Sequence, residues 1–423
     1  MTDDVVTGRR VVHVTTTDMS LALLLGPQLR AFANAGMDVI AASADGPWVK
    51  DLNAWGIHHE AVTHATRSVS ATDDVLALGE LVRLFRRLRP DIVHTHNPKP
   101  GVYGRLAARL AGVPVVVNTV HGLYASADDP LLRRAFVYGV ERAVSVCSQA
   151  ELVQNVEDIA VLERLHVPAR KLHLLGNGVD LVRFRPRPGE AETARRSLGV
   201  GADKVVAGVV GRLVWEKGFA ELFEAARRLR HTRPEVVVVV VGPTDPAKSA
   251  SLTRADLDRA RTEAGVVFLG EHREVEALYP GFDLFVLASH REGFPRSAME
   301  AAASGLPIVA SDIRGCRQVV DHGSTGLLVP VRDPVALAGA IGTLAADPAR
   351  RRAMGQAARG RAESEFDDRR VITRTLDTYR QLLSSGRRRG GPPPKDVSGP
   401  PARRRSASAF AEPPGARGPR PPY

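Results

Sequence analysis

The sequence predicts an α/β protein of two Rossmann-like domains, each a doubly wound parallel sheet, that face each other across a cleft. Three observations carry this prediction. The 423-residue chain is about twice the length that one hydrophobic core usually sustains. Short β-branched runs alternate with longer helical patterns, which is typical of βαβ units. A stretch rich in Gly, Asn, Pro and Arg at residues 177–189 divides this alternation into two series.

The strands expected in each series are short and mostly apolar. Strands covered by helices on both faces have this character, and open sheets built from them bind ligands at their carboxyl ends. The first series comprises residues 11–15, 38–42, 91–95, 113–118 and 143–147. The second comprises residues 204–210, 235–241, 266–269, 283–288 and 307–311. A last helical pattern covers about residues 362–384.

The domain assignment follows from these series. Residues 1–180 form the N-terminal domain, residues 181–365 the C-terminal domain and residues 366–384 a C-terminal helix. Residues 385–423 are rich in Pro, Arg and Gly and are expected to be disordered. This tail holds nine basic and two acidic residues, or +7 of the chain's +11, which leaves only +4 for the rest. We therefore expect no nucleic-acid partner, and attraction of the tail to anionic lipid is the alternative to a merely solvated end.

The chain is expected to be cytoplasmic, with any membrane contact peripheral and on the inner face of the plasma membrane. Its start is acidic and lacks the basic and apolar regions of an export signal. The longest apolar runs, such as residues 236–241, are far shorter than the roughly 20 residues that span a bilayer. Cys147 and Cys316 each stand in an apolar setting and are predicted to be buried thiols.

The segment VVAGVVGRLVWEKGFAELFEAA at residues 205–226 indicates an anion site. A buried strand and Gly211 are followed by Arg212 and Lys217, and then by a helix. A strand-to-helix crossover offers free backbone N–H groups and the positive end of a helix dipole. The forked guanidinium and the ammonium suit a diphosphate there. An exposed basic loop is the alternative interpretation.

The segment DLFVLASHREGFPRSAMEAAASGLPIVASD at residues 283–312 indicates a sugar site. It places Glu292 in a loop and Glu300 within the helix that follows. A carboxylate accepts several hydrogen bonds from sugar hydroxyls without a competing donor. Gly293 allows the backbone to approach a ligand closely, and Pro295 suits a helix start. Taken alone, Glu300 could instead be an acid that the helix dipole favours.

GRLVWEKG, together with two glutamates eight residues apart, resembles the retaining glycosyltransferases of family 4, which have the two-domain GT-B fold. The resemblance covers nearly all of the chain up to Ser384. It implies that the N-terminal domain binds the acceptor and the C-terminal domain a nucleotide sugar. It also implies that Glu292 is catalytic and contacts the donor sugar, and that Glu300 contacts the ribose. The remaining residues that it places against the donor are Gly211, Arg212, Lys217, Gly293, Phe294 and Pro295.

HTHNPKPG at residues 94–101, NTVHGLY at 118–124 and LLGNGVD at 174–180 resemble the branch that builds capsule, exopolysaccharide or polyprenyl-diphosphate-linked glycans. The resemblance implies that His121 is catalytic and lies near the transferred sugar, although a structural histidine is an equal alternative. Asn97 and Lys99 are acceptor candidates, a surface lysine being the alternative for Lys99. Asp18 and Ser20 are further acceptor candidates, but TTTDMSLALLLG at residues 15–26 lacks the glycine-rich loop of many relatives.

The expected reaction uses no metal and no cofactor. Asp256 and Asp258 lie in a strongly helical stretch where both face solvent, and no G-x-G-x-x-G follows the first strand. By resemblance the donor is a UDP-sugar, the acceptor a glycan or lipid-linked glycan, and the anomeric configuration is retained. Arg212 and Lys217 would stabilise the leaving diphosphate. The alternatives are a sugar-nucleotide epimerase of the same fold and a non-catalytic nucleotide-sugar-binding subunit.

Overall fold

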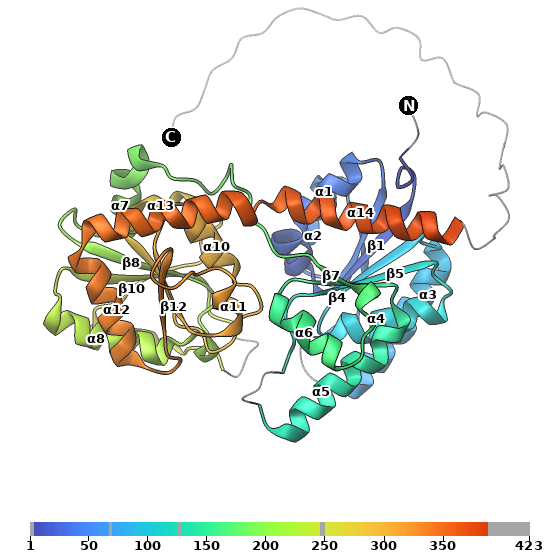
Figure 1. The fold of residues 1–423 in the computed structure, drawn as a ribbon, viewed down its shortest axis with the longest axis horizontal. Coiled ribbons are helices and arrows are strands. Elements are labelled where there is room, and N and C mark those ends of the chain that lie inside the picture. The colour runs from blue at the N-terminus through green and yellow to red at the C-terminus, as the bar shows by residue number, and fades with distance from the viewer. Residues whose placement is uncertain (1–3, 67–69, 126–128, 246–249, 388–423) are drawn as a thin grey trace, which may run out of the picture.

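The structure is a computed structural model that describes residues 4–66, 70–125, 129–245 and 250–387. Within these residues two parallel sheets lie side by side, each covered by helices on both faces (Figure 1). The strand orders are β3-β2-β1-β4-β5-β6-β7 and β10-β9-β8-β11-β12-β13. In each sheet the order in which strands are added reverses at one point, next to β1 and next to β8. Doubly wound sheets bind ligands at such a point. The predicted α/β fold class with two doubly wound sheets is confirmed.

The bounds of the strands and helices follow chain order. The strands are β1 (Arg10–Thr17), β2 (Asp38–Ala44), β3 (His58–Ala61), β4 (Ile92–His96), β5 (Val115–Val120), β6 (Ala150–Val153), β7 (Leu172–Leu174), β8 (Val205–Val210), β9 (Val236–Val241), β10 (Val267–Gly270), β11 (Leu284–Leu287), β12 (Ile308–Ser311) and β13 (Gly326–Val329). The helices of the first half are α1 (Gly26–Asn34), α2 (Val49–Ala54), α3 (Ala71–Leu88), α4 (Lys99–Leu110), α5 (Leu131–Val144) and α6 (Val156–Arg164). Those that follow are α7 (Ala191–Leu198), α8 (Phe219–Thr232), α9 (Arg254–Ala264), α10 (Arg296–Ala303), α11 (Arg314–Arg317), α12 (Pro334–Ala346), α13 (Pro348–Glu365) and α14 (Asp368–Arg387).

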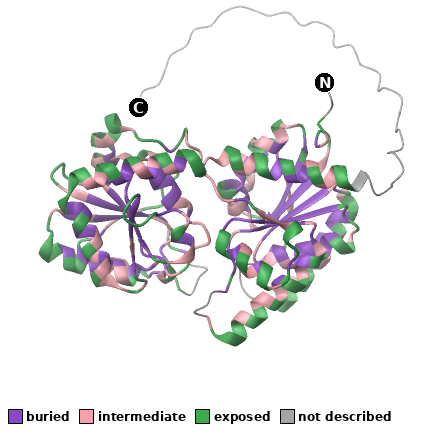
Figure 2. Ribbon diagram, viewed as in Figure 1, coloured by how far each residue is buried: buried purple, intermediate pink, exposed green. Residues whose placement is uncertain are grey.

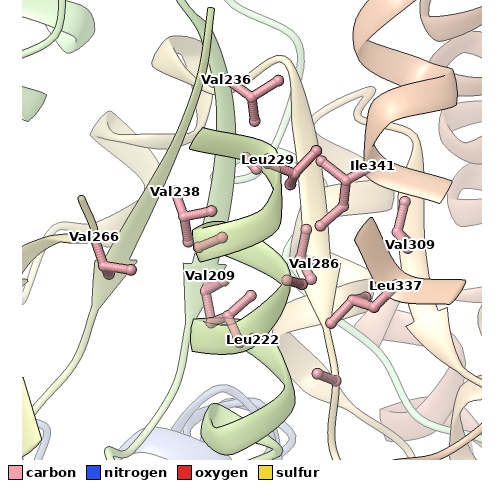
Figure 3. Packing of buried hydrophobic residues seen from close by; sticks show 14 of the residues in the cluster. Val209, Leu222, Leu229, Val236, Val238, Val266, Val286, Val309, Leu337 and Ile341 are labelled. Atoms are coloured by element: carbon pink, nitrogen blue, oxygen red, sulfur yellow. The ribbon is translucent and has the colours of Figure 1, made fainter. Parts of the chain in front are cut away.

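Both sheets are packed on two faces because successive strand residues point to opposite sides. In β1, Val11 joins a core with residues of α1 and α14, whereas Val12 joins a core with residues of α3 and α4. In the second half, side chains of α8 and α12 pack against one face of β8, β9 and β11 (Figure 3). Leu222, Leu229 and Ile341 are fully or almost fully buried there. Two-sided burial explains why these strands are apolar along their whole length.

The last two helices lead the chain from the second half of the molecule back to the first, with α13 on the second half and α14 on the first (Figure 1). The single helical pattern predicted over residues 362–384 is wrong in one respect, because α13 ends at Glu365 and α14 begins at Asp368. Between them Phe366 is buried, and its carbonyl accepts a hydrogen bond from the Val179 amide at 2.8 Å. Tyr379 of α14 is fully buried in the core of the first half. The predicted tail lies outside the described residues from residue 388 onward.

The strand predicted at residues 143–147 is wrong. These residues form the end of α5 and a 3-10 turn at Ser145–Cys147, and the sixth strand is β6 at Ala150–Val153. This strand was missed because it contains a charged residue. Glu151 is buried in it and accepts a hydrogen bond from Arg105 at 2.7 Å. Cys147 is half-buried rather than buried, whereas Cys316 is buried as predicted, and both thiols are free.

Candidate active site

The sequence motifs lie in loops at the carboxyl ends of strands, on the facing sides of the two halves. The loop after β8 carries Arg212 and Lys217, and the loop after β11 carries Glu292. In the first half, Asn97 follows β4 and His121 follows β5. Between the halves lies a cleft of about 890 Å³. Residues that line it include Arg133, Arg134, Tyr138 and Glu157 from the first half and His290, Arg291, Glu292 and Arg314 from the second.

Lys217 and Glu292 form an ion pair. Lys217 Nζ lies 2.6 Å from Glu292 Oε1, and Ser289 Oγ donates to the same oxygen at 2.7 Å. The two loops pack so tightly that only glycine fits at residue 218. Gly218 has a φ of +75°, and a Cβ there would lie 1.9 Å from the Ala288 carbonyl oxygen. The packing thus holds the cation predicted for the diphosphate beside the carboxylate predicted for the sugar.

Arg212 stands apart from this pair. Its Nη1 lies 2.6 Å from Asp245 Oδ2, and the Asp245 amide donates to Ser251 Oγ at 2.9 Å. Asp245 could not be predicted from sequence, because a single acid after a strand has no distinctive spacing. Next to Arg212, a Cβ on Gly211 would meet no atom within 4 Å, so this part of the loop borders open space.

Glu300 is buried on α10. Tyr279 Oη donates to its Oε2 at 3.0 Å, and Arg296 Nε donates to Oε1 at 3.1 Å. Burial raises the pKa of Glu300, and the neighbouring Arg296 opposes this shift. Arg296 also donates to the Leu23 carbonyl at 2.6 Å, so it links Glu300 to the first half.

His121 lies opposite, at the end of β5, on a loop that Asn97 holds in place. The Asn97 amide accepts from the His121 backbone N–H and donates to the Gly122 carbonyl, both at 2.8 Å. His121 lines a small hollow of about 40 Å³ together with Asn177 and Arg296. Removal of its ring from water lowers the pKa of His121 to about 4, so the imidazole is neutral at pH 7.

His121 ends a chain of hydrogen-bonded histidines that the sequence analysis missed. Its Nε2 lies 2.9 Å from His96 Nδ1, and His96 Nε2 lies 3.2 Å from His13 Nδ1. His94 bonds Tyr379 Oη at 2.5 Å and Thr119 Oγ1 at 2.7 Å. Period-2 alternation in HTH places His94 and His96 on one face of β4, which is the signal that could have found the chain.

The same histidines are the grouping among the described residues that could hold a metal ion. His13, His94 and His96 present nitrogen atoms within 4.8 Å of one another. However, the rings of His94 and His96 stack at 4.5 Å with an interplanar angle of 18°, instead of converging on one point. Hydrogen bonds also engage the nitrogens of all three rings. This geometry favours a hydrogen-bonded chain over a set of metal ligands.

The two halves touch where Gly293 meets the backbone of His121 and Gly122. A Cβ on Gly293 would lie 1.8 Å from the His121 carbonyl oxygen, so the backbones meet with no room for a side chain. Asn155 Nδ2 donates to the Gly293 carbonyl and Asn177 Nδ2 to the Phe294 carbonyl, each at 3.3 Å. Pro295 caps α10 directly after this contact. Glycine at residue 293 therefore brings together loops from both halves.

The other predicted acceptor residues contact the protein itself. The Asp18 carboxylate accepts the backbone N–H groups of Met19 at 2.8 Å and of Trp48 at 2.7 Å. Ser20 Oγ lies 3.1 Å from Thr17 Oγ1. Lys99 Nζ lies 2.5 Å from Asp74 Oδ1. The linings of the large cleft and of the small hollow include none of Asp18, Ser20 and Lys99, and their acceptor role stays a prediction.

Comparison with known proteins follows the same division into halves. A family model described as glycosyl transferases group 1 matches residues 190–361, and one described as glycosyl transferase 4-like matches residues 15–150. The chain is 31% identical over 63% of its length to an Escherichia coli UDP-Gal:alpha-D-GlcNAc-diphosphoundecaprenol alpha-1,3-galactosyltransferase, of which it covers 69%. This chain belongs to the group 1, family 4 glycosyltransferases. It is also 26% identical over 85% of its length to the Staphylococcus aureus capsular polysaccharide biosynthesis glycosyltransferase CapM, of which it covers 93%.

Solved structures show the GT-B fold of this glycosyltransferase. It superposes on Anabaena HepE, solved in complex with UDP, with a TM-score of 0.74 and 20% identity over 89% of this chain and 100% of that one. It superposes on a sucrose-phosphate synthase from Thermosynechococcus elongatus with a TM-score of 0.77 and 24% identity, again over 89% of this chain and 100% of that one. Among the described residues of this glycosyltransferase, no helix is long and apolar enough to cross a membrane.

Proposed function

We propose that this glycosyltransferase moves a hexose or N-acetylhexosamine from a UDP-sugar to a polyprenyl-diphosphate-linked glycan, with retention of the anomeric configuration. The observation that carries the proposal is the ion pair of Lys217 with Glu292 at 2.6 Å. It puts a cation suited to a diphosphate next to a carboxylate suited to sugar hydroxyls. In a nucleotide sugar the sugar is bonded directly to the diphosphate, so one donor molecule can contact Lys217 and Glu292 at once.

The donor assignment has further support. Arg212 borders open space at Gly211, where a diphosphate can approach the backbone. Glu300 lies on α10, directly after the loop of Glu292, and suits a ribose hydroxyl. HepE is solved in complex with UDP, and the E. coli relative is named for UDP-Gal. These likenesses favour uridine as the base.

The proposed chemistry needs little from the protein besides orientation and charge. The acceptor oxygen forms its bond to the anomeric carbon on the face from which the diphosphate departs. The bond from that carbon to the phosphate oxygen breaks, and the acceptor's proton passes to the departing phosphate oxygen. Lys217 and Arg212 stabilise the negative charge that develops there, and the neutral His121 hydrogen-bonds the transferred sugar.

The acceptor assignment rests on the cleft and on the relatives. Seven arginines and five acids line the cleft, so its walls carry an excess of positive charge that favours a diphosphate. The name of the E. coli relative specifies a diphosphoundecaprenol acceptor. A polyprenyl diphosphate bearing one sugar has both the anionic group and the hydroxyl that such a cleft would receive.

The test is a donor screen with purified full-length protein. UDP-linked hexoses and N-acetylhexosamines are incubated with polyprenyl-diphosphate N-acetylglucosamine, and the lipid is analysed by mass spectrometry. We expect one donor to extend the lipid by one sugar unit. A parallel incubation without acceptor should leave the donor unchanged. A new isomer of the donor in that incubation would favour the epimerase, and the absence of any product would favour a binding subunit.

A further inference from the structure

Helix α5 presents an apolar face to solvent. Leu132 is 87% exposed, Phe136 72% and Leu131 71%, and Val146 in the following 3-10 turn is 74% exposed. Helical spacing puts the small exposed residues between them on the same side, so that the face is continuous. We define the α5 apolar face as Leu131, Leu132, Ala135, Phe136, Gly139, Ala143 and Val146. Figure 2 shows α5 as a largely exposed helix at the outer edge of the first half.

This face is not needed to hold α5 on the protein, because the opposite side of the helix does so. Glu141 is buried and accepts a hydrogen bond from the Arg105 guanidinium at 2.7 Å. Tyr138 Oη donates to the Ala125 carbonyl at 3.1 Å. Single exposed apolar residues are ordinary, but a contiguous group of large ones marks a surface that a partner covers.

The charges around the face show what kind of partner fits. Arg133, Arg134 and Arg142 lie on α5, and the only acid of this helix, Glu141, is buried against Arg105. Asp129, just before the helix, pairs with Arg133 at 3.3 Å, so arginines still outnumber acids around the face. At its C-terminal end, Arg142 and Val146 line a hollow of about 380 Å³ together with Arg170 and Lys171. An apolar surface bordered by arginines matches the interface of a bilayer that contains anionic lipid.

The position of α5 relative to the cleft makes such docking useful. Arg133, Arg134 and Tyr138 of α5 line the same cleft that Glu292 lines. A bilayer lying against α5 would therefore bring a lipid-borne diphosphate to the mouth of this cleft. We propose that the α5 apolar face is a membrane-docking surface that seats this glycosyltransferase on anionic lipid. The benefit for catalysis rests on the proposed lipid-linked acceptor, whereas the docking itself does not.

The experiment compares the binding of full-length variants to lipid vesicles by co-sedimentation. The vesicles contain phosphatidylcholine either alone or mixed with phosphatidylglycerol. The test variant carries Leu132→Glu and Phe136→Glu. The matched control carries Val182→Glu and Val335→Glu, which are 69% and 58% exposed in the wild type and lie outside α5. Both variants gain two acids on the surface, so a difference between them isolates the α5 face from a general change in charge.

We expect the wild type and the control to bind the mixed vesicles, and the test variant to bind at least about 10-fold more weakly. Transfer to a water-soluble acceptor should be equal in all three proteins. Wild-type binding by the test variant would overturn the proposal, and so would a wild type that binds neither vesicle. Sedimentation velocity supplies a further check, because a dimer that only the test variant loses would assign the face to a second copy of the chain. Vesicle binding needs neither donor nor acceptor, so a failure of the proposed function leaves this result unaffected.

Discussion

The two sides of the cleft are built on different electrostatics. On the side of the second sheet, the two cations predicted for the diphosphate each have an acid as partner, in the pairs Lys217–Glu292 and Arg212–Asp245. On the side of the first sheet, His121 ends a chain of neutral histidines joined by hydrogen bonds. A diphosphate that binds Lys217 or Arg212 must compete with carboxylates, whereas a ligand at His121 meets an uncharged ring held by hydrogen bonds. Paired charges on one side and neutral histidines on the other come from different elements, so we expect changes in pH and single substitutions to affect the two sides separately.

Acid should destabilise the half of the molecule that contains the histidine chain before it destabilises the other half. Burial lowers the pKa of His13 to about 3 and of His121 to about 4, and holds the pKa values of His94 and His96 well below 6.5. Because the folded-state values are lower than the unfolded value, the unfolded chain binds more protons below pH 6.5. The stability contribution is therefore complete above pH 6.5 and decreases as the pH falls, by about 2 kcal/mol at pH 5 for each of His13 and His121.

Hydrogen exchange followed by mass spectrometry from pH 7 to pH 5 can resolve the two halves. We expect the strands β1 and β4 to lose protection before β8 and β11 do. The pKa of Glu151 in the same half is raised, so protonation of this carboxyl favours the folded state in acid and reduces the loss of protection. In the second half, Glu300 has a raised pKa, so acid does not destabilise its site. Equal loss of protection in both halves would contradict the comparison.

Disturbing the contact between the halves should have an effect nearly as large. In Gly293→Ala the new Cβ meets the His121 carbonyl oxygen, so the two loops must move apart. Displacement of reacting groups by about 1 Å can cost about 100-fold in rate, and we expect a loss of that order in kcat. Gly360→Ala on α13, where a Cβ meets no atom within 4 Å, is the control and should retain wild-type rates. Thermal unfolding should show that both variants remain folded.

Removing a donor-side cation should weaken nucleotide binding without changing the fold. We expect Lys217→Ala to bind UDP about 10- to 100-fold more weakly, since a hydrogen bond to a charged group is worth about 1.5–3 kcal/mol. Calorimetric titration measures this directly. Lys204→Ala, at a lysine whose Nζ lies 3.7 Å from Asp203 Oδ2 in the same half, is the matched control. Equal UDP affinities in the two variants would show that Lys217 does not bind the donor.

The smallest effect is expected from the C-terminal tail. A chain that ends at Arg387, where α14 ends, should transfer sugar to a water-soluble acceptor at the wild-type rate. Its binding to anionic vesicles should weaken modestly at low salt only, because exposed charges are screened within about 10 Å at 0.1 M salt. Unchanged vesicle binding would show that the tail has no role at the membrane.

The location of the residues proposed for the donor could be predicted from the sequence because they stand in short, contiguous motifs. Arg212, Lys217 and Glu292 each follow a strand whose apolar run identifies it, so their meeting at one sheet edge follows from the parallel topology. Their partner Asp245 could not be predicted, because it comes from a separate loop after β9. The histidine chain was missed for a similar reason: its end at Tyr379 lies 285 residues after His94. The strand β6 was missed because it contains the buried charge of Glu151. The other central strands are apolar along their length because both faces are buried, and this pattern identifies them in the sequence.

We propose that Glu292 binds the sugar, while Lys217 beside it binds the diphosphate. The most direct measurement compares UDP binding with sugar transfer in Glu292→Ala, with Glu224→Ala on α8, where Glu224 pairs with Arg227 and Arg228, as control. We predict that transfer falls at least about 100-fold, because a group that stabilises the transition state is lost. UDP affinity should be equal to or higher than that of the wild type, because Lys217 no longer pairs with a carboxylate. Wild-type transfer, or loss of UDP binding in parallel with loss of transfer, would contradict this division of roles.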